Sequence, residues 1–189
     1  MPTSPRAHRR ADVTTVELVG GVEKRELIVV DPDPTWPQIY RHHADRIRDA
    51  LGPRGAVAIE HIGSTSVPRL AAKPIIDILV VVDDITAEED YLPQLIGAGY
   101  VLRVREPGHR LVRTPERDVH VHILETNDPQ IREYLLLRDH LRRDEADRKL
   151  YARTKRDLAA QDWPDMNAYA MAKSEVVEQI LARAKNPTA

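Results

Sequence analysis

Short apolar runs alternate with turn signals over the first two thirds of the chain and predict the strands of one sheet. The strongest run covers residues 75–82 and is apolar except for Asp77. An apolar run of this kind is typical of a strand that is buried on both faces. Further strands are predicted over 13–19, 26–30, 56–60, 100–105, 110–114 and 119–124. The first two flank Gly20 and Gly21, and we expect them to form a hairpin.

Other segments of the chain show the periodicity of helices. One helix is expected over 36–51, after the Asp-Pro-Asp-Pro stop signal, and another over 88–97. The last part of the chain predicts three consecutive helices, over 129–142, 144–161 and 165–185. This order favours an α+β fold, in which a mixed β-sheet core (about 12–126) is covered by helices on one face and is followed by a C-terminal three-helix extension (about 129–185).

Length and composition fit a single domain. The 189 residues are 42% hydrophobic and 31% charged, as in globular proteins. We therefore predict one domain over 12–189, preceded by a disordered tail over 1–11. The chain contains no Cys, which excludes disulfides and thiolate chemistry and fits a reducing, cytoplasmic location.

Charge and hydropathy narrow the set of partners. The formal net charge of −2 provides no overall attraction to nucleic acid or to anionic membranes, so it disfavours a nucleic-acid partner. No apolar run approaches the roughly 20 residues that span a bilayer, which predicts no membrane association. The first residues lack the apolar stretch of a secretory signal. The sequence carries no indication of oligomeric state.

A Gly-Ser turn separates the predicted strands 56–60 and 75–82. Its residues are Gly63, Ser64, Thr65 and Ser66. A strand that ends at such a turn leaves backbone N–H groups free to bind a phosphate. The carboxylate of Asp77 is costly inside an apolar strand unless a cation or hydrogen bonds compensate it. We therefore predict a nucleotide-and-metal site here; a hydrogen-bonded structural Asp77 is the alternative.

Two histidines lie on the predicted strand 119–124. His120 and His122 are two positions apart, so both rings project from the same face. This spacing suits two ligands of one metal, or one ligand and one proton donor. Asp118 extends the series on that face. Two half-exposed strand histidines are the alternative interpretation.

Each C-terminal helix places a cation on its apolar face. Arg138, Lys155 and Lys173 occupy these positions, and Tyr151 and Tyr169 precede the two lysines by four residues. A cation on a buried face must find an anion, although long side chains also reach the rim of a core. Lys is rare beside Arg in this chain, which adds Lys73 to the candidate phosphate-binding groups.

These motifs resemble the GrpB family of the nucleotidyltransferase superfamily, members of which are sometimes fused to dephospho-CoA kinase. The resemblance covers roughly residues 28–183. It is carried by the stretches DPDPTWPQIY, IEHIGSTSVPRLAAKPIIDI, HVHIL, LLRDHLR and YAMAKSEVV.

The resemblance implies a nucleotidyltransferase-like sheet in which the Gly-Ser turn binds nucleotide phosphates and acids on later strands bind metal. Gly63, Ser64 and Asp77 match this pattern, but Leu79 stands where the superfamily has its second acid. His120 or His122 replaces the third acid, and Arg69 stands where the family usually has Gly. The implied ligands are ATP or another nucleoside triphosphate and a divalent metal, Mg²⁺ or Mn²⁺, with Zn²⁺ as the alternative that imidazole ligands suit.

The leading functional hypothesis is an enzyme that transfers a nucleotidyl group to an unidentified small-molecule acceptor, with adenylate-forming ligase chemistry as a variant. Asp77, His120 and His122 are its predicted catalytic and metal-binding groups. A non-catalytic module that binds a nucleotide or a coenzyme A precursor is the alternative. In a third interpretation the inward cations pair with Glu60, Asp77 and Asp139 in a polar core that contains no pocket.

Overall fold

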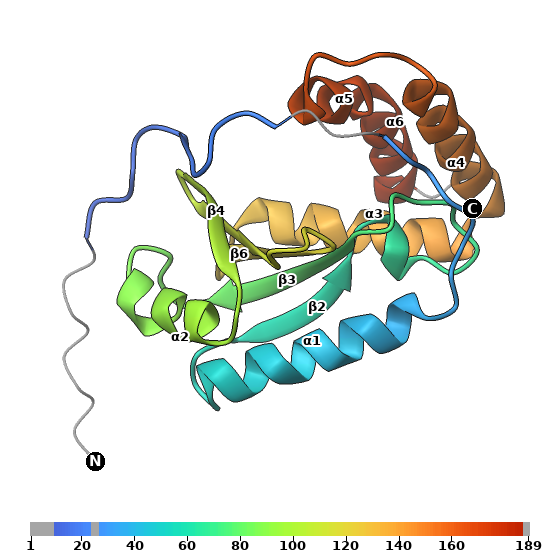
Figure 1. Cartoon of the computed structure of the whole chain (residues 1–189). Coiled ribbons are helices and arrows are strands. Elements are labelled where there is room, and N and C mark those ends of the chain that lie inside the picture. The colour runs from blue at the N-terminus through green and yellow to red at the C-terminus, as the bar shows by residue number, and fades with distance from the viewer. Residues whose placement is uncertain (1–9, 24–26, 187–189) are drawn as a thin grey trace.

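The computed structural model describes residues 10–23 and 27–186 (Figure 1). Most of the predicted tail over 1–11 lies outside these residues, and within them Arg10 forms an ion pair with Glu89. No helix in the described part of the chain is both long enough and apolar enough to cross a membrane.

A six-stranded mixed sheet forms the centre of the molecule, in the order β1-β4-β5-β6-β3-β2. Its strands are β1 Glu17–Leu18, β2 Ala58–Ile62, β3 Ile76–Val82, β4 Val101–Glu106, β5 His109–Arg113 and β6 Val119–Glu125. The strands β3 and β6 are parallel, and the other neighbours are antiparallel. The predicted α+β class with a mixed sheet is therefore confirmed.

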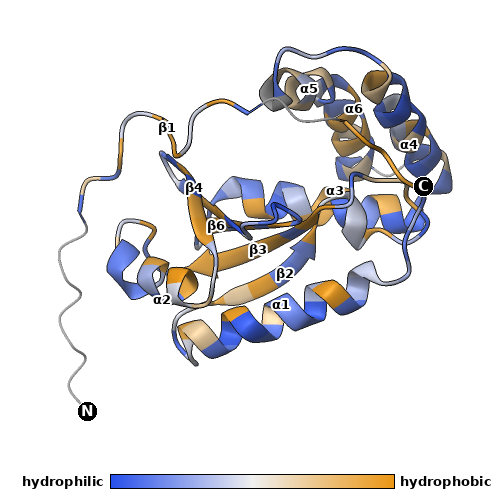
Figure 2. Cartoon of the chain, in the orientation of Figure 1, coloured by the Kyte–Doolittle hydropathy of each residue, from blue (hydrophilic) through white to orange (hydrophobic). Residues whose placement is uncertain are grey.

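Helices cover both faces of this sheet, so the expectation of one covered face was wrong (Figure 1). On one face the core includes Ile78 and Val80 of β3 with the helices α1 Trp36–Leu51 and α2 Leu92–Gly97. On the other face Leu79 and Val81 pack under α3 Pro129–Arg143. The reason is that β3 is apolar at alternate positions on both sides, and each side needs a cover. Figure 2 shows this apolar character along the central strands.

The C-terminal part contains four helices rather than the predicted three. They are α3, α4 Glu145–Ala159, α5 Met166–Ala172 and α6 Ser174–Lys185. The predicted helix 165–185 is divided at Lys173, which is the N-cap residue of α6. The helices α3, α4 and α6 enclose a further apolar cluster with Val67 and Leu70, which follow the Gly-Ser turn. The helices are thereby docked onto the turn.

The predicted N-terminal hairpin was wrong. β1 pairs with β4 at the edge of the sheet, and Val30 bridges to Ala72. Glu26 lies outside the described residues. The guanidinium of Arg103 donates hydrogen bonds to the carbonyls of Val19 and Gly21, so long-range contacts with the sheet edge outweigh the local turn signal. The predicted helix 88–97 is a 3₁₀ turn over Glu88–Asp90 followed by α2.

Candidate functional site: a carboxylate and two imidazoles beside a glycine turn

The Gly-Ser turn lies directly on the carboxylate of Asp77. Gly63 has φ 68°, in the region that favours glycine. A Cβ at this position would lie 2.4 Å from Asp77 Oδ2, so the close approach also requires glycine. The hydroxyl of Ser66 donates to the carbonyl of Gly63 at 2.6 Å and closes the turn.

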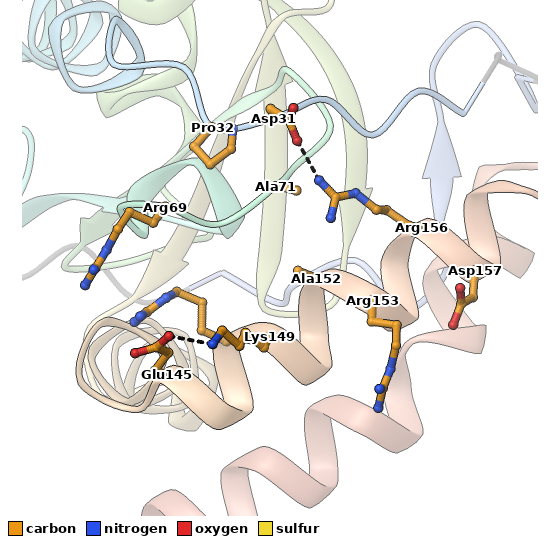
Figure 3. Close-up of a pocket in the computed structure, with 11 residues that line it drawn as sticks. Asp31, Pro32, Arg69, Ala71, Glu145, Lys149, Ala152, Arg153, Arg156 and Asp157 are labelled. Carbon is orange, nitrogen blue, oxygen red and sulfur yellow. Dashed lines mark hydrogen bonds and ion pairs between the residues drawn. The ribbon is translucent and has the colours of Figure 1, made fainter.

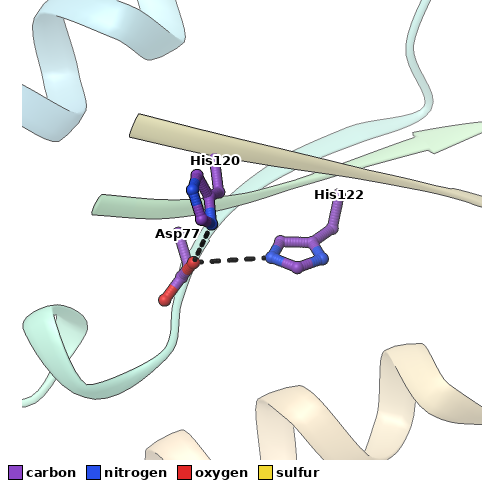
Figure 4. A group of neighbouring side chains, drawn as sticks. All are labelled: Asp77, His120 and His122. Atoms are coloured by element: carbon purple, nitrogen blue, oxygen red, sulfur yellow. Dashed lines mark hydrogen bonds and ion pairs between the residues drawn. The ribbon is translucent and has the colours of Figure 1, made fainter. Parts of the chain in front are cut away.

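Asp77 and the two histidines form one cluster (Figure 4). The parallel register places His120 directly beside Asp77, with His122 two residues further along β6. His122 Nε2 lies 3.4 Å and His120 Nδ1 3.8 Å from the same oxygen, Asp77 Oδ1. One ligand atom from each of the three residues lies within 4.8 Å of the others. This spacing is compatible with a single shared cation.

Two further residues, which sequence reasoning missed, extend the cluster. His109 Nε2 lies 3.2 Å from His122 Nδ1, and His109 Nδ1 lies 2.6 Å from Glu106 Oε1. A hydrogen-bonded row therefore runs from Asp77 through His122 and His109 to Glu106. Both added residues flank the Pro107-Gly108 turn of the β4–β5 hairpin. A histidine three residues after a glutamate across a predicted hairpin turn was the available signal.

The charges in the cluster suit cation binding. Burial acts to raise the pKa of Asp77, but the hydrogen bond with His122 and the nearby side chains of His122, His120 and Lys173 together hold this pKa below its usual value. Burial lowers the pKa of His120 to about 4, so its imidazole is neutral at neutral pH. In the described part of the chain, no group hydrogen-bonds the buried His120 Nε2. The cluster therefore offers one carboxylate anion and neutral imidazole.

A cavity of about 550 Å³ opens beside this cluster. Such a volume is in the usual range for small-molecule sites. Its walls come from the turn, from β3 and β6, and from the helices α3 to α6. Among the predicted site residues it is lined by Gly63, Ser64, Asp77, His122, Arg138, Tyr151 and Lys173. The interpretation with a polar core is met in part, since Arg138 pairs with Glu60 and Asp139, but its expectation that there is no pocket was wrong.

The other predicted residues surround the cavity without lining it. Thr65 donates to the carbonyl of Ile75 at 3.0 Å and, like Ser66, is buried within the turn. Lys73 and His120 line a smaller neighbouring hollow of about 160 Å³. Asp118 accepts a hydrogen bond from Thr114 and is not part of the cluster.

The two Tyr–Lys pairs have different positions. Lys155 is 2% exposed, and its Nζ lies 4.6 Å from the centre of the Tyr151 ring. It donates to Ser64 Oγ at 2.8 Å and to the carbonyl of Ala71 at 2.5 Å. These two hydrogen bonds connect α4 to the Gly-Ser turn and to the loop that follows it. Lys173 Nζ lies 4.7 Å from the centre of the Tyr169 ring and faces the cavity.

Arg138 reaches the cavity wall but already has anionic partners. It donates to Glu60 Oε2 and to Asp139 Oδ1, each at 2.8 Å. Lys173 is the more available cation. Burial lowers the pKa of Lys173, and the negative charge of Asp77 opposes this shift.

A second His/Asp group, formed by His140, Asp144 and Asp147, does not resemble a ligand site. Asp147 is bound by the guanidinium of Arg183 and, at 2.6 Å, by His140. The side chain of Asp144 caps α4 through the amide of Asp147. These carboxylates are thus satisfied by groups of the protein itself.

The buried Lys155 predicts how stability depends on pH. Burial lowers its pKa to about 7, whereas an unfolded lysine has about 10.4. Between these values the unfolded state binds a proton that the folded state lacks, so stability rises with pH. We expect the free energy of unfolding to increase by about 2 kcal/mol between pH 7 and 9.

Urea unfolding of the wild type and of Lys155→Met across this interval measures the effect. The chain contains no Cys, so no thiol titrates in the same window. We expect a flatter profile for Lys155→Met, and equal slopes in the two proteins would contradict the assignment.

The fold is that of an α+β protein with a nucleotidyltransferase-like arrangement of sheet and helices. A chain in the structure of the GLD-2/RNP-8 complex is similar, with a TM-score of 0.54 and 18% sequence identity, over 84% of this chain and 63% of that chain. At this identity the likeness concerns the fold alone. The family profile described as GrpB protein matches residues 26–183. The chain belongs to the GrpB family.

Relatives support the same membership. A UPF0157 protein from Streptomyces coelicolor is 59% identical over 182 residues, which are 96% of this chain and 97% of the relative. The crystal structure of conserved protein GrpB from Enterococcus faecalis has a TM-score of 0.73 and 32% identity, over 83% of this chain and 96% of that chain. A dephospho-CoA kinase from Mycolicibacterium paratuberculosis is 37% identical over 75 residues, which are 38% of this chain and 18% of the kinase. The family resemblance inferred from the motifs is confirmed.

Proposed function

We propose that this protein is a nucleotidyltransferase-like enzyme. It binds ATP or another nucleoside triphosphate with a divalent metal and transfers the nucleotidyl group to a small-molecule acceptor. The observation that carries the proposal is the convergence of Gly63, Asp77, His122 and Lys173 at one cavity of about 550 Å³, with His120 beside Asp77.

The phosphate end of the nucleotide has a chemically suitable wall. Ser64 and Lys173 both line the cavity together with Asp77. Lys155 stabilises the turn through Ser64 Oγ and so positions that hydroxyl. Arg138 keeps its bonds to Glu60 and Asp139 and shapes the wall.

The metal is held by Asp77, His120 and His122. Two nitrogen donors and one carboxylate suit Mn²⁺ or Zn²⁺ better than Mg²⁺, which prefers oxygen ligands. His120 Nδ1 and His122 Nε2 both lie near the same oxygen of Asp77, and this donor set fits a single cation. Such a cation, when bound, supplies neutralisation of phosphate charge.

Titration calorimetry of the full chain with ATP tests the proposal. We expect Mn²⁺ to strengthen ATP binding and EDTA to reverse this gain, together with pyrophosphate release once a suitable acceptor is added. Absence of ATP binding under all metal conditions would refute it.

A non-catalytic nucleotide-binding module is the second candidate. It is favoured by the identity of Leu79, which is fully buried under α3 at the position of a second acid, so the cluster has a single carboxylate. Tight binding that is independent of metal, without pyrophosphate release across a screen of acceptors, would support the module over the enzyme.

The hydrogen-bonded row from Glu106 to His122 predicts that His109 supports metal binding indirectly, through its contact with His122. His109 contacts the His122 nitrogen that faces away from Asp77, and thereby fixes the orientation of the ring. We expect His109→Ala to weaken Mn²⁺ or Zn²⁺ binding about 10- to 100-fold in calorimetry. The exposed His42 on α1 provides the control variant, His42→Ala, which is expected to bind metal as the wild type does. Equal dissociation constants in all three proteins would exclude this role for His109.

A further inference from the structure

A second pocket, of about 470 Å³, lies on the outer side of α4 (Figure 3). Its walls are the segment with Asp31 and Pro32, the loop with Arg69 and Ala71, and most of the length of α4. Five of its lining residues are cations, namely Arg69, Arg148, Lys149, Arg153 and Arg156. Three are acids, namely Asp31, Glu145 and Asp157. The lining therefore carries an excess of positive charge.

The backbone at Arg69 is strained in a way that requires explanation. Leu70 N donates to the carbonyl of Val67 at 3.3 Å, which closes a turn with Pro68 in its second position and Arg69 in its third. Arg69 has φ 65°, as the third residue of a type II turn must, and glycine is the residue that this position favours. A side chain that persists in such a conformation is a candidate for function.

The arginine side chain is exposed and extends into the pocket. Figure 3 shows it reaching from the loop toward the end of α4 that carries Glu145 and Lys149. The hydrogen bond with Lys149, and then the positive charges of Lys149, Arg148 and Arg69, lower the pKa of Glu145. One carboxylate thus lies among three cations.

The ion pairs in the pocket leave room for a ligand. The Lys149–Glu145 pair spans 2.7 Å, but both side chains are more than half exposed, and such pairs contribute little. Arg156 is engaged with Asp31 at 2.6 Å on another side of the pocket. An incoming anion can therefore recruit Lys149 and Arg69 without breaking a buried contact.

We propose that this pocket binds a small phosphate-bearing molecule, with the phosphate contacting Arg69 and Lys149. Guanidinium and ammonium groups are the usual protein partners of phosphate. The volume matches a small molecule. The net charge of −2 provides no long-range attraction for a nucleic acid, which favours a small ligand over a polymer. This site is distinct from the cavity beside Asp77, since α4 directs Lys155 toward that turn and Lys149 toward this pocket.

Titration calorimetry of the full chain with pyrophosphate, in the absence of divalent metal, tests the proposal. We expect Arg69→Gly and Lys149→Gln each to weaken binding about tenfold or more. Arg69→Gly is expected not to lower the melting temperature, because glycine relieves the strained turn. That result separates loss of the ligand contact from loss of the fold.

Two variants serve as controls. Arg41→Gln removes one exposed cation from α1, and Arg54→Gln removes one from the turn that follows α1. Both are expected to bind pyrophosphate as the wild type does. The proposal is overturned if the wild type does not bind, if Arg69→Gly binds equally well, or if either control variant loses as much affinity as Arg69→Gly. Tighter binding of a short single-stranded oligonucleotide than of pyrophosphate at the same salt concentration would also overturn it.

Discussion

The Asp77→Asn variant is expected to lose metal binding and metal-dependent turnover while remaining folded. Asparagine has nearly the same shape as aspartate, so the packing of β3 between its neighbours is retained. The anion that faces His120, His122 and Lys173 disappears, however, and with it the charged oxygen of the proposed site. We expect the loss of metal affinity to exceed the roughly 100-fold cost of removing an outer partner.

Metal titration and pyrophosphate release measure this effect, and thermal unfolding checks the fold. Asp83→Asn is the matched control, since Asp83 is exposed and directly follows the same strand. Its metal affinity and melting temperature should equal those of the wild type. Retained turnover in Asp77→Asn would remove Asp77 from the proposed chemistry.

The second large effect is expected from Gly63→Ala. The new Cβ would lie 2.4 Å from Asp77 Oδ2 and 3.0 Å from Asp77 Cβ, in addition to the strain of a positive φ. Together these costs predict a destabilisation of about 2–4 kcal/mol. The carboxylate must also move away from the two imidazoles, so metal and ATP binding should fall with stability.

Alanine variants at two other glycines separate the steric contact with Asp77 from the backbone strain as causes of the destabilisation. Gly21 has φ 74° and open space around it, so Gly21→Ala reports the conformational strain alone. Gly97 has an ordinary backbone and open space, so Gly97→Ala should be neutral or slightly stabilising. Urea unfolding of the three variants should rank Gly63→Ala as the least stable. A cost at Gly63 equal to that at Gly21 would show that contact with Asp77 does not matter.

Local patterns predicted the central elements well. The helix at 36–51 matches α1, and the runs at 75–82 and 119–124 match β3 and β6 to within one residue at each end. Periodicity within a short window determines such elements. The edge of the sheet was not predictable in this way, because the pairing of β1 depends on Arg103, which is remote in sequence.

The sequence predicted which residues belong to the candidate site better than it predicted the contacts that they make. The grouping of Asp77 with His120 and His122 follows from two parallel strands in register, together with the family resemblance. The partners of Arg138 and Lys155 depend on how α3 and α4 dock, which no local pattern specifies. The roles of these residues in binding and catalysis stay predictions.

The walls of the cavity are contributed by both the turn at Gly63 and the last two helices, which has a consequence for biosynthesis. During translation the strands that bear Asp77 and His122 emerge well before Lys173 and α6. A nascent chain that stalls between them lacks Val176 and Ile180 of α6, leaves the apolar side chains of Val67 and Leu70 without these partners, and has no complete ligand chamber. The proposed nucleotide ligand would not stabilise such an intermediate, so ribosome-bound fragments that end before α5 are expected to depend on chaperones for solubility.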